Sequence, residues 1–170
     1  IASLIFYAWG GIYYLLIMVF SIALNFLGGY FINKVRENKA KKKAALVITV
    51  VLNLAMLFFF KYTDFFIGIL NGVLSTHIPT LGIRLPIGIS FYTFQAMSYT
   101  IDVYRGDTTA QKNPVTLATY VALFPQLIAG PIVRYTTVEE DLTERKHTFE
   151  NFSCGVTRFV VGLSKKVLIA

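Results

Sequence analysis

Cysteine and histidine are nearly absent from this sequence. The one cysteine, Cys154, has no second thiol in the chain, which excludes an internal disulfide and a metal site built from paired cysteines. The two histidines lie far apart, His77 in the uncharged stretch STHIPT and His147 in the charged stretch ERKHTFE, and we interpret both as solvated loop residues. The sequence therefore predicts no metal site, no bound cofactor and no catalytic residue within this chain.

Charged residues are also few, at 15% of the chain against ~25% in an average soluble protein, whereas 55% of the residues are hydrophobic. The apolar residues recur in runs along the whole chain, which is typical of an integral membrane protein. The 16 Lys and Arg outnumber the 9 Asp and Glu, but they gather beside the apolar runs. Membrane topology and anionic lipid head groups explain that pattern. We therefore expect the lipid bilayer, and not a nucleic acid, as the partner of these charges.

Two common catalytic motifs are missing. No G-x-x-x-x-G-K phosphate-binding loop is present. The stretch GISFY at 88–92 starts like the turn that carries a nucleophilic serine, but Tyr92 stands where that motif requires glycine. The residues by themselves therefore predict a cavity-lining membrane scaffold without an active site.

Three apolar stretches are predicted to cross the membrane as helices: 12–32, 44–60 and 85–101, with an extension of the second to 70 left open. Between the first two lies NKVRENKAKKK, 33–43, whose six basic residues and one acidic residue predict the cytoplasmic side. Because the chain opens inside an apolar run with no polar flank, we expect a fragment that begins within a helix.

Two pairs of opposite charge are spaced i, i+3 near the ends of predicted spans: Lys61 with Asp64, and Asp102 with Arg105. This spacing lets two side chains meet on one face of a helix. We interpret both as local ion pairs at the membrane interface. For Lys61 and Asp64, a buried pair within a transport pathway is the alternative.

The third span carries several polar side chains among its aromatic residues: Ser90, Thr93, Gln95, Ser98 and Thr100. Polar groups within a bilayer need hydrogen-bond partners, since the lipid chains offer none. This helix is therefore predicted to face protein or a cavity over much of its surface.

The stretch 115–133 is apolar enough to cross the membrane, yet it contains Pro125, Gly130 and Pro131. Proline removes an N–H and glycine permits unusual dihedral angles, so these residues suit a turn. The basic residues beyond Arg134 favour keeping both ends of the stretch on the cytoplasmic side. We therefore predict a re-entrant or broken segment that borders a water-accessible cavity. A proline-kinked crossing helix is the alternative.

The last stretch, 151–170, places apolar residues near a spacing of 3.6 and adds basic side chains, which predicts an amphipathic helix at the membrane interface. The fold expected for residues 1–170 is thus a single membrane domain, an all-α integral membrane protein. Its architecture would be a polytopic helix bundle with a re-entrant or broken segment around 115–133.

Two stretches of this sequence closely resemble the membrane-bound O-acyltransferase family: LPIGISFYTFQAMSYTIDVYRGDT at 85–108 and LFPQLIAGPIVR at 123–134. Within the family, the match is to the branch like bacterial alginate O-acetyltransferase and the teichoic-acid D-alanyl transferase. The stretches at 6–9, 61–66 and 158–170 also look like that branch, so the resemblance extends over essentially the whole chain.

The resemblance implies a multi-pass protein of a cell membrane, such as the bacterial inner membrane, whose helices surround a tunnel. It implies transfer of an acyl group, acetyl in this branch, from a cytoplasmic thioester donor like acetyl-CoA across the membrane. The acceptor would be an extracellular polysaccharide such as alginate, reached with an extracytoplasmic acetyl-transferring partner protein. The catalytic histidine of the family follows a tryptophan, and neither histidine here does. The chain therefore resembles the N-terminal-to-middle portion of a longer protein, without the catalytic part.

In that setting, the broken segment would shape the cytoplasmic mouth of the tunnel. Gln126 could form hydrogen bonds there, Arg134 could meet a phosphate of the donor, and Gln95 and Ser90 are candidates for the tunnel wall. The alternative is that Gln126 satisfies broken backbone groups and Arg134 anchors to lipid phosphate. A transporter or channel subunit, or a non-catalytic scaffold of a polysaccharide export complex, stays open as an alternative function.

Overall fold

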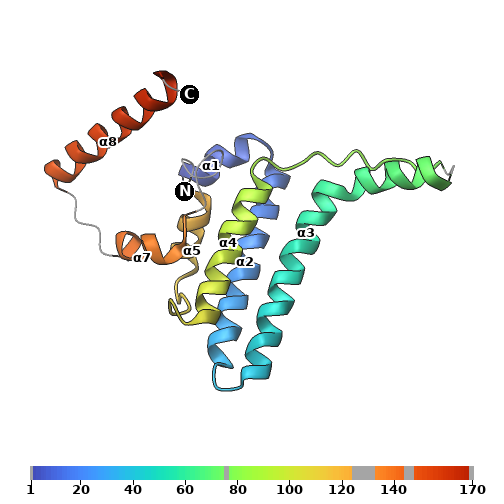
Figure 1. Ribbon diagram of the computed structural model, residues 1–170, viewed down its shortest axis with the longest axis horizontal. Helices are drawn as coiled ribbons and strands as arrows, with labels where there is room; N and C mark the ends of the chain where they lie inside the picture. Colours follow the sequence, from blue (N-terminus) through green and yellow to red (C-terminus); the bar gives the residue numbers. More distant parts are fainter. Residues whose placement is uncertain (1, 75–76, 124–132, 144–147, 169–170) are drawn as a thin grey trace. The chain divides into compact units, whose positions relative to one another are not determined.

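The computed structural model describes residues 2–74, 77–123, 133–143 and 148–168 (Figure 1). Within these ranges the chain forms helices joined by turns and loops, with no strand, so the all-α prediction is confirmed for the described residues. The helices are α1 (Ala2–Trp9), α2 (Ile12–Lys34), α3 (Lys39–Leu74), α4 (Ile89–Arg105), α5 (Pro114–Ala122), α7 (Tyr135–Thr143) and α8 (Phe149–Leu168).

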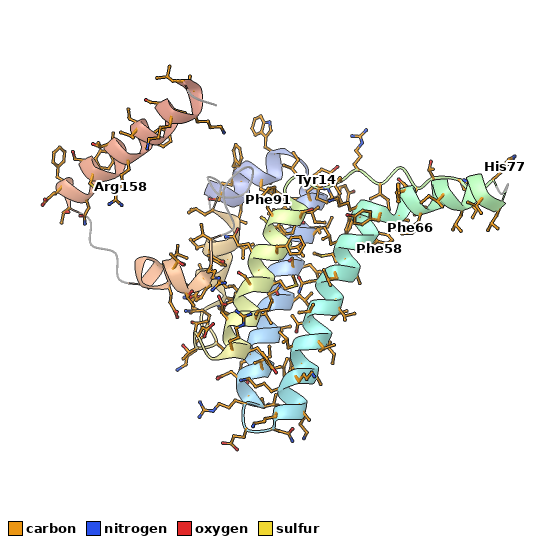
Figure 2. The ribbon with its side chains drawn as sticks, viewed as in Figure 1. Tyr14, Phe58, Phe66, His77, Phe91 and Arg158 are labelled. Carbon is orange, nitrogen blue, oxygen red and sulfur yellow. The ribbon has the colours of Figure 1, made fainter. Side chains whose placement is uncertain are left out.

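Among the described helices, two are long and apolar enough to cross a membrane, α2 with 23 residues and α3 with 36. Helix α2 covers the predicted stretch 12–32 and ends two residues beyond it. Helix α3 covers 44–60 and continues to Leu74, so the extension to 70 belongs to the same helix. Figure 1 shows α3 bending in its second half, and Figure 2 shows Phe58 and Phe66 near the bend, with ring centroids 5.1 Å apart.

Helix α4 begins later than the predicted span 85–101. Gly88 adopts the left-handed conformation with a φ of 74°, which a helix cannot continue, and the N–H of Ile89 donates to the carbonyl of Pro86 in the preceding turn. At the other end Gly106 has a φ of 89° and closes the helix with a bond to the carbonyl of Asp102. Gly88 and Gly106 therefore set the two ends of α4, and the predicted span 85–101 begins and ends four residues before the observed helix.

The turn between α2 and α3 lies at the same end of the bundle as the C-terminus of α4. Asn38 begins α3 by accepting the N–H of Lys41 on its side-chain oxygen at 3.0 Å. One residue on, the Lys42 ammonium lies 5.0 Å from the centre of the Tyr104 ring on α4. The basic stretch 33–43 and the last turn of α4 are therefore neighbours, and the cytoplasmic side predicted for the basic stretch would apply to both.

Helix α2 is the centre of the first compact unit, residues 1–139, and packs against α1, α3, α4 and α5. Two consecutive glycines permit the close packing. A Cβ on Gly28 would lie 2.6 Å from Oγ1 of Thr49 on α3, and a Cβ on Gly29 would lie 2.8 Å from the hydroxyl of Tyr99 on α4. Both distances are too short for real contacts, so only glycine allows the two helices to approach α2 at this level.

Helix α5 covers the first half of the predicted re-entrant stretch 115–133. Its start follows from sequence, because Asn113 accepts the N–H of Val115 at 2.9 Å and Pro114 occupies the first turn. The remaining part of the stretch, 124–132, lies outside the described residues, and with it lie the four predicted site and turn residues Pro125, Gln126, Gly130 and Pro131.

The second compact unit, residues 140–170, contains α8. This helix covers most of the stretch 151–170 that was predicted as interfacial. The large apolar side chains Phe152, Phe159 and Val167 are exposed, and Lys165 and Lys166 lie in its last turn. Its position at the membrane interface stays a prediction.

Candidate functional site

A pair of asparagines joins α2 and α3 inside the bundle. Asn25 Nδ2 donates to Asn53 Oδ1 at 2.9 Å, and Asn53 Nδ2 donates back to Asn25 Oδ1 at 3.2 Å. Thr100 on α4 donates its hydroxyl to the same Asn25 oxygen at 2.9 Å. The remaining amide hydrogens go to backbone carbonyls one turn earlier, those of Ser21 and Thr49. The pair is fully buried with its donors satisfied, so its role is to hold three helices in register.

Sequence reasoning did not single out Asn25 or Asn53. The available signal was one asparagine near the middle of each of the first two predicted spans, since a polar residue at such depth needs a partner. Thr100 was expected to require a partner within protein, and the structure supplies it. The candidate functional site itself lies elsewhere, toward the C-terminal end of α4.

Three buried tyrosines form a cluster at that end: Tyr99 on α4, Tyr120 on α5 and Tyr135 at the start of α7. The Tyr135 ring stands edge-on to both others, with centroid distances of 5.1 Å to each. The Tyr99 hydroxyl accepts the N–H of Gln111 at 2.9 Å, which fixes the loop between α4 and α5. Burial raises the pKa of Tyr135 to about 12, so its hydroxyl stays protonated at neutral pH. We call these three residues the tyrosine cluster.

Gln95, a predicted tunnel residue, is buried beside the tyrosine cluster. The Gln95 side-chain Nε2 donates to the backbone carbonyl of Tyr120 at 2.9 Å. The backbone carbonyl of Gln95 accepts a hydrogen bond from the Ser98 hydroxyl at 2.8 Å. Ser90, the other predicted tunnel residue on this helix, is half-buried in the first turn of α4, five residues before Gln95, and no hydrogen bond joins it to the cluster among the described residues. The structure therefore brings Gln95, but not Ser90, into the polar cluster.

Two hydrogen bonds link residues distant in sequence around the predicted broken segment 115–133. The first joins two residues inside the segment, and the second joins residues on either side of it. The Tyr120 hydroxyl donates to the carbonyl of Val133 at 2.6 Å. Further out, Thr108 Oγ1, in the loop after α4, donates to Glu139 Oε2 on α7 at 2.7 Å. Residues on the two sides of 115–133 therefore meet at the same end of α4.

Asp102 is buried in the last turn of α4, with 3% of its surface exposed, and its Oδ2 has no hydrogen-bond partner among the described residues. Burial raises the pKa of this carboxyl, and the positive charge of Arg134, more than that of Arg105, opposes the rise. Arg134 is itself exposed. Carboxyl groups with perturbed pKa values gather at functional sites, so Asp102 and Arg134 are candidates for a polar binding site.

Neither of the ion pairs predicted from i, i+3 spacing, Lys61 with Asp64 and Asp102 with Arg105, forms a salt bridge among the described residues. Asp64 instead accepts the N–H groups of Leu81 and Ile83, at 2.9 and 3.1 Å, and so anchors the loop that follows α3. The Lys61 ammonium lies over the Tyr62 ring at 5.4 Å. Asp102 points into the bundle while Arg105, one turn on, is exposed. Asp64 is held away from Lys61 by its bonds to the loop backbone, and Asp102 is held away from Arg105 by its burial in the bundle.

A stability prediction follows from the buried Asp102. Because folding raises its pKa, its contribution to stability is present at acid pH and is lost as pH rises through the folded-state pKa, when a charge must be held in the bundle. We expect Asp102→Asn to raise the thermal midpoint by a few degrees at about pH 8 and to change it little at about pH 4, near the usual aspartate pKa.

Thermal unfolding of the detergent-solubilised full-length protein across that range measures the effect. Asp107→Asn, an exposed neighbour, serves as the control that should leave the midpoint unchanged at both values. A lower midpoint for Asp102→Asn at alkaline pH would show that the ionised carboxylate stabilises the fold.

Neither histidine enters this site. His77 is exposed in the loop after α3 and lies at the outer end of that helix (Figure 2), and His147 lies outside the described residues. Among the described side chains, no group of three or more His, Cys, Asp or Glu is close enough together to hold a metal ion.

No family model and no solved structure matches this chain. The chain is 41% identical over 174 residues to the probable alginate O-acetylase AlgI of Pseudomonas aeruginosa, covering 100% of this chain and 34% of that protein. It is 40% identical to the protein of the same name from Azotobacter vinelandii, with 99% and 35% covered. It is also 34% identical to a peptidoglycan O-acetyltransferase of Helicobacter pylori, with 100% and 37% covered. The chain thus spans about a third of the length of the curated relatives it matches.

Proposed function

This chain belongs to the membrane-bound O-acyltransferases of the alginate O-acetylase type, and we propose that the protein it represents transfers an acetyl group to an extracellular polysaccharide. The donor would be a cytoplasmic thioester such as acetyl-CoA, and an extracytoplasmic acetyl-transferring protein would be the partner. The proposal is supported by relatives named for O-acetylation of alginate and of peptidoglycan. This chain would supply the cytoplasmic part of the tunnel wall.

The proposed function is carried by the relatives named for O-acetylation, and the proposed path of the chain through the membrane is carried by the hydrogen bond between Thr108 and Glu139. This bond places the chain before α5 and the chain after Val133 at the end of the bundle that bears the basic stretch 33–43. A helix that crossed over 115–133 would separate its ends by about 27 Å, at 1.5 Å per residue. The bond therefore supports a re-entrant segment with both flanks on the cytoplasmic side.

In this arrangement Arg134 is positioned to meet the donor. It is exposed, it follows the re-entrant segment directly, and its charge acts on the buried Asp102. A guanidinium binds phosphate groups through two parallel hydrogen bonds, which suits the phosphates of a nucleotide-linked thioester. The tyrosine cluster and Gln95 would hold the backbone around Arg134 in place.

We expect Arg134→Ala to raise the KM for acetyl-CoA about tenfold, equivalent to the loss of about 1.4 kcal/mol of binding, with little change in kcat. The measurement is the rate of thioester consumption by the full-length protein in vesicles. Arg84→Ala is the matched control, since Arg84 is exposed in the loop at the opposite end of α4 and should leave KM unchanged. An unchanged KM in Arg134→Ala would refute the donor role of Arg134.

The same vesicles test the activity itself. An acetyltransferase consumes the thioester and labels the polymer when given acetyl-labelled donor, whereas a transporter subunit or a scaffold does neither. Absence of both signals from the full-length protein with its partner present would refute the proposed function.

A further inference from the structure

An apolar groove of about 440 Å³ runs between α2 and α3. Its Thr49 hydroxyl is used inside α3, where it donates to the carbonyl of Ala45 at 2.9 Å, so the wall offers almost no free polar group. The lining side chains come from both helices: Leu24, Leu27, Gly28, Phe31, Val35, Lys41, Ala44, Ala45, Ile48, Thr49 and Leu52.

Gly28 lies in the lining where Thr49 of α3 packs directly against α2, because a Cβ on Gly28 would lie 2.6 Å from the Thr49 hydroxyl oxygen. Around that point, large apolar side chains remain about half exposed: Leu27 and Phe31 at 50% each, and Ile48 at 60%. Because α2 and α3 have the length and composition of membrane spans, we expect this surface to lie within the hydrocarbon region. The acyl chains of membrane lipids would therefore surround the groove and could fill it.

One end of the groove is cationic. Lys41 is part of the lining, and five further basic residues flank it in the turn and at the start of α3, against the single acid Glu37. The side chain of Lys42 faces Tyr104 on α4, whereas that of Lys41 lies at the groove, with no salt bridge to any described carboxylate. The groove is thus lined by apolar side chains along most of its length and is positively charged at the end beside the basic stretch 33–43.

The length of the groove matches one leaflet of a bilayer. From Lys41 to Leu52, α3 rises about 16 Å at 1.5 Å per residue. Half of a ~30 Å hydrocarbon core is about 15 Å. A chain that starts at Lys41 would therefore reach the middle of the membrane at Leu52.

We propose that this groove binds one anionic phospholipid of the cytoplasmic leaflet, with an acyl chain against α2 and α3 and the phosphate at Lys41. Charge complementarity selects an anionic lipid over a neutral one, because each basic residue near the surface attracts anionic head groups. The site is separate from Asp102 and the tyrosine cluster, and the proposal does not depend on the acetyltransferase activity.

Native mass spectrometry of the full-length protein in detergent tests the proposal, with phosphatidylglycerol and phosphatidylcholine as probes. We expect at least a fivefold preference for phosphatidylglycerol. Ala44→Trp fills the groove from an exposed position and should reduce bound phosphatidylglycerol severalfold, whereas Ala55→Trp, exposed on the same helix but outside the lining, should not.

Lys41→Gln removes the charge at an exposed position and does not disturb the packed interior. It should abolish most of the preference for phosphatidylglycerol, and Lys112→Gln, an exposed lysine outside the groove, should preserve it. Equal binding of both lipids by the unmodified protein, or unchanged binding in Ala44→Trp, would overturn the proposal. The second result would mean that another part of the full-length polypeptide covers the groove.

Discussion

Replacing Asn25 by leucine is expected to lower the free energy of unfolding of the full-length protein by about 2–3 kcal/mol. The substitution leaves the Asn53 amide and the Thr100 hydroxyl buried without their shared partner. An unsatisfied buried polar group costs about 1–3 kcal/mol. Hydrogen bonds between membrane helices are weaker on average than this, so the loss of two partners at once is what makes the effect large.

The asparagine pair can be separated from general damage to the core by a double-mutant cycle. Asn25→Leu and Asn53→Leu together should cost less than the sum of the two single changes, by at least about 0.5 kcal/mol, because the second change removes a group already left unpaired. Reversible unfolding in mixed micelles gives the four free energies.

Ser21→Ala provides a matched control for this cycle. Ser21 is equally buried one turn before Asn25, but its hydroxyl has no hydrogen-bond partner among the described residues. Its replacement should therefore change stability little. Additive effects of the two asparagine substitutions would show that the pair is not an energetic unit.

The second large effect is an all-or-none difference in labelling. In a background with Cys154→Ser and other cysteines removed, single cysteines at Thr109 and Thr137 should react with a membrane-impermeant maleimide only after the cells are lysed. Both residues are exposed, one before α5 and one in α7. The reason is the hydrogen bond between Thr108 and Glu139, which holds these two segments at one end of the bundle.

A cysteine at Thr80, exposed in the loop between α3 and α4, is the internal reference for the opposite side. It should react in intact cells. Labelling of position 137 in intact cells, together with protection of position 109, would establish a crossing segment and refute re-entry. Labelling of all three positions in intact cells would mean that the assay does not report sidedness and calls for a second reagent before any conclusion.

Several features of the site were accessible from sequence. Gln95 and Thr100 were identified as polar groups that needed protein partners, and both have them. The return of the chain around 115–133 was argued from the distribution of basic residues and stays a prediction, with which the Thr108–Glu139 bond agrees. Tyr99, Tyr120 and Tyr135 were not identified, because aromatic residues in a membrane protein are common and their spacing in sequence shows no pattern.

The sequence alone determined the apolar character of the chain and the approximate positions of its long helices, and the cytoplasmic side of the basic stretch 33–43 stays a prediction from its charge. These properties add up residue by residue, since the transfer of each side chain into lipid depends mainly on its own chemistry. The tertiary structure alone decided which polar groups meet. Asn25 pairs with Asn53, and Asp64 binds the backbone of the next loop in preference to Lys61. Such contacts depend on the rotation and spacing of whole helices, here set by the missing side chains of Gly28 and Gly29, and no local pattern specifies them.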